Sequence, residues 1–231
     1  LVGWVMCIRG RCGSVEVGNA MVQVLTDVLP LVALGVIADV MPLTGENRAI
    51  VQAGLQRIRS VDMPGLRALI HVGGLDGDGV DTDAVGFRLA PRINAAGRLE
   101  HAMTSFRLLT APSYAEAEEL AVHLEGLNTR RQRLTRELVE RARAQARAGD
   151  PDALLLLVGG EEFQPGIAGL VAGRLAEEFY RPAIVYHRDG EVSRGSGRSI
   201  PEFDISAALD RREGPRSADP DYRIPPPAET A

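Results

Sequence analysis

Residues 111–150 read "APSYAEAEELAVHLEGLNTRRQRLTRELVERARAQARAGD", the strongest periodic pattern of the chain. Leucines recur along it at steps of three and four residues, which is typical of an amphipathic α-helix. Glutamates crowd the first half and arginines the second, so the charges complement the helix dipole. Arg131 interrupts the leucine stripe, and we expect it either on an exposed flank or turned into a cleft between domains. The pattern predicts one long helix over residues 112–150.

Downstream of this helix, the sequence predicts a small α/β domain over residues 151–210. "PDALLLLVGG" (151–160) suits a buried strand, and "PGIAGLVAGRLAEEF" (165–179) a helix with small residues on one side. "RPAIVYHRDGEVSRGSGRS" (181–199) predicts two strands joined at Asp189 and Gly190, a dipeptide typical of hairpins. Residues 211–231 are rich in proline, and we expect them to be disordered.

Upstream, short elements are expected over residues 18–111. The apolar run at 28–40 fits a strand or a buried helix, and it leads into a surface helix that Thr44 or Asn47 could cap. Residues 62–75 predict a short helix with Pro64 near its start. Residues 81–99 predict another turn of helix that runs into a loop. The fold class is therefore α/β, and residues 1–17 match no recognised pattern.

Composition limits the kinds of function. The net charge of -5 argues against a generally basic nucleic-acid binder, so a site for a polyanion would have to be a local cluster of arginines. The longest apolar run is about half of a membrane span, and we expect no signal peptide, because the first residues show no cleavage-site pattern after a basic n-region. We therefore expect a cytoplasmic protein without a membrane partner. Cys7 and Cys12 have no further metal ligands nearby, so a zinc site is not expected.

Two segments combine arginine with small residues. "LAPRINAAGRL" (89–99) sets Arg92, Asn94 and Arg98 among alanines and a glycine, so a ligand could approach the backbone closely. Arginine presents a planar fork that suits phosphate oxygens. On the residues alone, both a phosphate-binding loop and an ordinary surface loop remain open.

"GSGRS" (195–199) repeats this chemistry with two hydroxyls, two glycine amides and the charge of Arg198, which together predict an anion nest. If the two segments face one cleft, they could grip one phosphate. Gly166 and Gly169 at the start of a predicted helix suit either an anion at the helix N-terminus or close helix packing. The chain has no P-loop and no nucleophile elbow.

Asp39 ends the apolar run in "ALGVIADVMPL" and is the candidate acidic group. A carboxylate held by a packed element could serve metal or proton chemistry, or simply act as a cap or ion-pair partner. One aspartate does not make a metal centre, and the four histidines are scattered without ligand spacing.

Five motifs in order carry a resemblance to a known family: "LVALGVIADVMPLTGENR", "FRLAPRINAAGRL", "LNTRRQRL", "PGIAGLVAGRL" and "GSGRS". From about Gly18 to Leu209 the chain resembles the RecJ family of bacterial single-stranded-DNA-specific exonucleases, in the DHH/DHHA1 phosphoesterase superfamily. The resemblance implies a metal-dependent 5′ to 3′ exonuclease, a hydrolase of recombination and repair. Residues 18–111 would be the C-terminal part of a DHH domain, 112–150 the connecting helix and 151–210 the DHHA1 domain.

The resemblance also assigns roles to residues. It implies a complete enzyme that uses Mn²⁺ or Mg²⁺ and single-stranded DNA, with a single-strand-binding protein or a helicase as partners, and a 5′-phosphate held between the DHH and DHHA1 domains. Asp39 would be a catalytic, metal-binding aspartate. The implied contacts to DNA or its 5′-phosphate are Arg92, Asn94, Arg98, Arg131, Gln132, Ser196, Gly197 and Arg198.

The chain also departs from this family. RecJ proteins carry their Asp-His-His motif and other metal-binding aspartates before the position of Asp39, and a histidine commonly precedes Pro-Gly where this chain has Gln164. The proline-rich tail replaces the segment that follows "FDISAALD". We therefore expect the isolated chain to lack most metal ligands and to be inactive. The alternatives are an oligoribonuclease or phosphoadenosine-phosphate phosphatase of the same superfamily, and a non-catalytic nucleic-acid-binding module.

Overall fold

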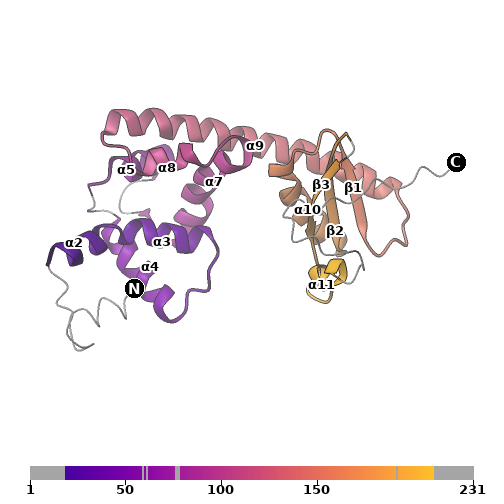
Figure 1. Ribbon diagram of the computed structural model, residues 1–231, viewed down its shortest axis with the longest axis horizontal. Coiled ribbons are helices and arrows are strands. Elements are labelled where there is room, and N and C mark those ends of the chain that lie inside the picture. The colour runs from indigo at the N-terminus through magenta and orange to yellow at the C-terminus, as the bar shows by residue number, and fades with distance from the viewer. Residues whose placement is uncertain (1–18, 59, 61, 76–78, 191, 211–231) are drawn as a thin grey trace. The chain divides into compact units, whose positions relative to one another are not determined.

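The computed structural model describes residues 19–58, 60, 62–75, 79–190 and 192–210. The chain divides into two compact units, Leu1–Asn128 and Thr129–Ala231, and the boundary falls within the long helix α9 (Tyr114–Ala148) (Figure 1). The predicted long helix is therefore confirmed. The expectations for residues 1–17, for Cys7 and Cys12 and for residues 211–231 lie outside the described residues.

The described part of the first unit is helical. Its core joins α5, a π-helical turn, α8 and the first half of α9 through fully buried side chains such as Leu69, Leu89, Leu108 and Leu124. The elements are α2 (Asn19–Asp27), α3 (Leu29–Ala38), α4 (Gly45–Arg57), α5 (Pro64–Val72), α6 (Thr82–Ala84), the π-helix η2 (Val85–Leu89), α7 (Ala90–Leu99) and α8 (Met103–Leu109).

The apolar run at 28–40 is a helix, which settles the choice between strand and buried helix. Helix α3 packs closely on α4 because Gly54 has no side chain: a Cβ there would lie 2.6 Å from the carbonyl oxygen of Leu29. Thr44 is the N-cap of α4 but makes no hydrogen bond to the helix through its side chain. Asn47 instead donates from Nδ2 to the carbonyl oxygen of Pro42 at 3.0 Å.

The prediction of a loop over residues 89–99 is wrong, because these residues form helix α7. Ala95 and Ala96 are fully buried in the core, where only small side chains fit beside the neighbouring helices. Pro91 lies in the first turn of α7, where a missing backbone N–H costs no hydrogen bond. Ser105 of α8 donates to the carbonyl oxygen of Ile93 at 2.7 Å and fixes α8 against α7. Small residues here serve helix packing.

The C-terminus of α3 has an unusual cap. The N–H of Met41 donates to the carbonyl of Val36, and the N–H of Val40 to that of Ile37, the two bonds of a Schellman motif. Its left-handed position normally holds glycine, as Gly74 does after α5, but here it holds Val40 with φ +54°. A β-branched residue is strained in this conformation. The strained residue, Val40, directly follows Asp39, the C-cap residue of α3.

The second unit contains the predicted β-α-β-β order and a short final helix. Its elements after α9 are β1 (Leu156–Gly160), α10 (Pro165–Phe179), β2 (Ala183–Asp189), β3 (Val192–Arg198) and α11 (Ile205–Asp210). The sheet order is β1-β2-β3, with β1 parallel and β3 antiparallel to β2. The chain is thus mixed α/β and mostly helical.

Helix α10 packs on β2 and β3 and closes one face of this sheet. Its buried side is formed by Ile167, Val171 and Leu175 with three alanines, and Val158 and Val185 of the strands are buried as well. The expectation that residues 151–160 form a buried strand is only half right. β1 lies at an edge of the sheet, and Leu157 on it is 64% exposed.

The second half of α9 is fixed to this α/β unit by polar contacts. Arg143 donates from Nε and Nη2 to the carboxylate of Glu178 on α10, at 2.7 to 2.9 Å. This hydrogen bonding holds the pKa of Glu178 below its usual value. Gln145 accepts the N–H of Gly159 at 3.2 Å, which satisfies an amide on the edge of β1. Within the described ranges, no helix is both long and apolar enough to cross a membrane.

We expect Val40→Gly to raise the free energy of unfolding by up to about 1 kcal/mol, because glycine adopts positive φ without strain. The Val40 side chain is 87% exposed, so its removal loses little buried apolar surface. Urea denaturation would measure the change. The matched control is Gly74→Ala, where φ is +64° and the new Cβ would lie 2.9 Å from Nη2 of Arg88. This variant should be destabilised, and a loss of stability in Val40→Gly would contradict the strain argument.

Candidate phosphate-binding site

The segment "GSGRS" is not the bare loop that the sequence predicts. Gly195, Ser196, Gly197 and Arg198 belong to β3 and pair in register with residues 186 to 183 of β2. The backbone of these residues is extended and does not form the concave nest that the sequence predicts; because β3 is an edge strand, only alternate N–H groups point toward β2. Ser199, also expected to bind the anion, donates its hydroxyl to the carbonyl oxygen of Phe203.

The side chains of Ser196 and Arg198 lie on the sheet face that carries α10. A Cβ on Gly169 would lie 3.1 Å from Nη2 of Arg198 and 3.5 Å from Oγ of Ser196. One turn further along α10, a Cβ on Gly173 would lie 4.0 Å from Cγ of Arg198. The arginine therefore extends along two glycines of the helix, and close packing at Gly169 is observed.

Arg198 is exposed, and its guanidinium is directed by one hydrogen bond. Nη1 donates to the carbonyl oxygen of Gly197 at 2.7 Å, and the other guanidinium edge lies beside Gly169. An anion at this point would meet a planar cationic fork and the hydroxyl of the half-buried Ser196. The arrangement suits a phosphate or a carboxylate.

The start of α10 adds a favourable field at the same end of the site. Its first turn contains no acidic residue, and Pro165 occupies the first turn without an N–H to satisfy. The carbonyl of Gln164 accepts the N–H groups of Ile167 and Ala168, both at 2.9 Å. The positive end of the helix dipole therefore has no carboxylate of its own helix to neutralise it.

The arginines of α7 differ from one another in their surroundings. Arg92 lies inward, with Nε 2.5 Å from Oε2 of Glu125 on α9, in an ion pair without hydrogen-bond geometry. Its side chain is only 14% exposed, so it joins two helices of the first unit. Asn94 and Arg98 are exposed and stand one turn apart on the outer side of α7. Of the three predicted residues of this helix, these two lie at the surface and Arg92 does not.

On α9, Arg131 is half-buried and Gln132 is exposed. Nε of Arg131 is shielded from solvent, which fits a position on the leucine stripe. Arg98 and Arg198 belong to different units. Their sharing of one phosphate therefore stays a prediction.

Asp39 is exposed at the C-cap of α3. A divalent cation needs several oxygen or nitrogen ligands. Among the residues that the structure describes, no three His, Cys, Asp or Glu side chains are grouped so that they could hold a metal ion. The described donor set therefore does not fit a catalytic metal.

Two contributors were missed by sequence reasoning. Gly173 completes a row of glycines with Gly166 and Gly169, and the spacing of three and four residues in "GIAGLVAG" would have revealed it. Glu125 is the partner of Arg92, and no local signal joins residues that lie on different helices. Only the structure could show that Arg92 is already paired.

Comparison with known proteins finds extensive similarity, although no family model matches the chain. The single-stranded-DNA-specific exonuclease RecJ of Bacillus subtilis is 39% identical over 197 residues, which are 84% of this chain and 25% of that protein. RecJ of Escherichia coli is 35% identical over 205 residues, 84% of this chain and 34% of that protein.

Solved structures agree. Two crystal structures of RecJ from Thermus thermophilus, in complex with Mg²⁺ and with Mn²⁺, are each 37% identical in sequence to this chain and match it with a TM-score of 0.71. Each match covers 83% of this chain, and it covers 30% of the Mg²⁺-bound chain and 29% of the Mn²⁺-bound chain. The chain spans a quarter to about a third of the length of these relatives. Over more than four fifths of its length, the chain is therefore similar to one part of the RecJ exonucleases.

Proposed function

We propose that this chain is a DNA-holding part of a RecJ-type 5′ to 3′ exonuclease, which acts on single-stranded DNA in recombination and repair. The observation that carries the proposal is the placement of Ser196 and Arg198 against Gly169 of α10, within the part of the chain that is similar to RecJ. In terms of domains, the first unit would be the C-terminal part of a DHH domain and the α/β unit a DHHA1 domain.

The ligand of the Ser196 and Arg198 site is the 5′-phosphate of the strand. A terminal phosphate monoester carries more negative charge than an internal phosphodiester and offers three strong acceptor oxygens. A guanidinium, a hydroxyl and the start of α10 all favour that extra charge. Gly197 contributes through its carbonyl oxygen, which accepts the hydrogen bond from Nη1 of Arg198 at 2.7 Å. The site would therefore prefer a phosphorylated end to an internal position.

The rest of the strand is held through its backbone. Residues 129–148 of α9 carry seven arginines and two glutamates in a chain whose net charge is -5, and three of the arginines, Arg133, Arg143 and Arg147, are paired with glutamates. Such a local basic stretch attracts phosphates without regard to base sequence. Arg131 and Gln132 lie on this stretch, and Asn94 and Arg98 offer a second exposed set on α7. Arg92, paired with Glu125, would act by fixing α7 against α9.

Cleavage belongs to the complete enzyme. Asp39 would contribute one carboxylate to a site for Mn²⁺ or Mg²⁺, the ions named for the Thermus structures. Such an ion activates a water molecule for attack on a phosphodiester. Since the described residues do not provide a metal-binding group, we propose that the isolated chain binds DNA without cutting it. The similarity to RecJ favours part of a single-stranded-DNA exonuclease over an oligoribonuclease or a phosphoadenosine-phosphate phosphatase.

The binding proposal predicts a preference for 5′-phosphorylated single strands. Fluorescence anisotropy of a labelled oligothymidylate, with and without a 5′-phosphate, would measure it at several salt concentrations. Arg198→Ala should remove the preference, about a tenfold loss or more, because it deletes charge-assisted hydrogen bonds worth roughly 1.5–3 kcal/mol. Arg174→Ala on the exposed side of α10 removes the same charge and should keep the preference. Equal binding of both strands by the unmodified protein would refute the 5′-phosphate site.

The inactivity proposal predicts no digestion of labelled single-stranded DNA by the isolated chain in Mn²⁺ or Mg²⁺. The check is gel analysis of the products over a time course. Mn²⁺-dependent digestion that is lost both with EDTA and in Asp39→Asn would show that the chain builds a working metal site. Digestion that persists in Asp39→Asn would point to a contaminating nuclease, and the assay would be repeated on repurified protein.

The contacts at Gly169 and Gly173 predict that alanine at these two positions has different effects on phosphate binding. Gly169→Ala should weaken 5′-phosphate binding about fivefold, because its Cβ would displace the guanidinium of Arg198 by steric contact, a cost of roughly 1 kcal/mol. Gly173→Ala should bind normally, since its Cβ meets only ordinary contact distances. Both should melt no lower than wild type, because alanine favours a helix interior. Equal phosphate affinity in the two variants would show that the Arg198 position is unimportant.

A further inference from the structure

The face of the sheet that lies away from α10 has an unusual surface. Side chains alternate along a strand, and Ala183 and Val185 of β2 are buried. Ile184, Tyr186 and Arg188 therefore lie on the opposite face. The register places further residues on that face: Leu157 and Gly159 of β1, and Ser193, Gly195 and Gly197 of β3. Glycines thus flank the middle strand on both sides.

The ring of Tyr186 lies flat across β1. A Cβ on Gly159 would lie only 2.5 Å from Cδ1 and Cε1 of Tyr186, so the ring occupies the space that a side chain at 159 would fill. On the other side, a Cβ on Gly195 would lie 3.3 Å from Cβ of Tyr186. Neither directly paired neighbour on this face has a side chain to stand beside the aromatic ring.

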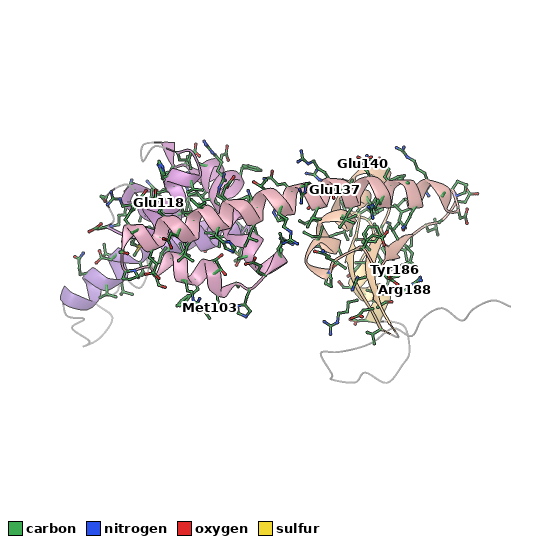
Figure 2. All side chains as sticks on the ribbon, turned by 90° about the horizontal axis from the view of Figure 1, so that it is seen from above. Met103, Glu118, Glu137, Glu140, Tyr186 and Arg188 are labelled. Carbon is green, nitrogen blue, oxygen red and sulfur yellow. The ribbon has the colours of Figure 1, made fainter. Side chains whose placement is uncertain are left out.

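In the described part of the chain, several residues of this face are exposed or half-buried. Helix α11 reaches the end near Gly197, where a Cβ would lie 3.1 Å from Cδ1 of Ile205. At the other end, Arg188 is exposed and is paired with the small Ser193. On β1, Leu157 is 64% exposed, and Tyr186 itself is half-buried. Figure 2 labels Tyr186 and Arg188 at successive positions of this face of β2.

We propose that Tyr186 is a stacking platform for a base of single-stranded DNA, with Arg188 beside it as a contact to the phosphate backbone. This rests on the proposed function, in which the unit binds a single strand. An aromatic ring on an exposed sheet face stacks bases of any sequence, since every base has a π-face. The ring of Tyr186 already lies flat against Gly159, so its outer face can receive a base. Arg188 forms no ion pair within the described part of the chain, and its charge complements a phosphate.

The platform and the 5′-phosphate site lie on opposite faces of one sheet. Ser196 and Arg198 project toward α10, whereas Tyr186 projects away from it. The two contacts should therefore act independently. Loss of Arg198 should abolish the preference for a 5′-phosphate, whereas loss of Tyr186 should weaken binding of phosphorylated and unphosphorylated strands by the same factor.

The experiment compares Tyr186→Leu, Tyr186→Phe and wild type in the full chain, with oligothymidylates that carry a 5′-phosphate or a 5′-hydroxyl. Leucine keeps an apolar cover over Gly159 but cannot stack. We expect Tyr186→Leu to bind both oligonucleotides about fivefold more weakly or worse, as loss of one stacked base predicts. Tyr186→Phe keeps the ring and should bind as wild type does. Thermal melting of each variant checks that the fold is retained.

A second readout tests for the base itself. An oligonucleotide in which all bases are replaced by abasic sites has a backbone but nothing to stack, so wild type and Tyr186→Leu should bind it equally. In an oligonucleotide containing 2-aminopurine, stacking on the ring should quench the fluorescence with wild type and Tyr186→Phe. Quenching should be reduced with Tyr186→Leu.

Three outcomes would overturn the platform. These are unchanged affinity of a folded Tyr186→Leu, an equal loss on the abasic strand, and binding in which Tyr186→Phe is as weak as Tyr186→Leu. If wild type binds no single strand at all, the proposed function fails first, and the platform fails with it. If wild type binds with a preference for the 5′-phosphate but Tyr186→Leu is unaffected, the platform alone is wrong.

Discussion

The close approach of α10 to β3 is the constraint on which the candidate site depends. The sheet has three strands, and α10 packs on β2 and β3. The side chain of Arg198 lies between the helix and β3: a Cβ at position 169 would lie 3.1 Å from its Nη2, whereas a Cβ at position 173 would meet its Cγ only at 4.0 Å. The glycine at 169 therefore leaves the space that the guanidinium occupies. The helix thus both packs against the sheet and carries the glycine beside which the guanidinium lies.

Two arginines with similar neighbours in the sequence differ in their surroundings in the structure. Arg92 and Arg198 both stand among small residues in the sequence, yet Arg92 is paired with Glu125 and Arg198 lies exposed beside a helix. Pairing removes most of the electrostatic attraction that a phosphate would feel, since the carboxylate already neutralises the guanidinium. The charge balance of the immediate neighbourhood, rather than the motif, decides which arginine can receive a ligand.

The periodic elements can be predicted from the sequence, and the small-residue segments cannot. The leucines of α9 and the Asp189-Gly190 turn are local signals, which is why the predicted long helix and hairpin are confirmed. Glycine and alanine add little to a hydrophobic periodicity, so the sequence predicts loops at both "PRINAAGR" and "GSGRS". Ala95 and Ala96 are in a helix because the surrounding core admits nothing larger, and residues 195–198 are in a strand because β2 pairs with them. Both causes are contacts with distant parts of the chain.

At two places in the α/β unit, a glycine leaves space that a large side chain from a neighbouring element occupies. On the α10 side, the absence of a side chain at Gly169 allows Arg198 to lie along the helix; on the opposite face, its absence at Gly159 allows Tyr186 to lie across the strand. Glycine is costly inside helices and strands, since it loses more conformational freedom on folding than other residues. Core packing gains little from an exposed arginine and a half-exposed tyrosine. The conformational cost of the two glycines is better explained if the side chains of Arg198 and Tyr186 are held in place for a ligand.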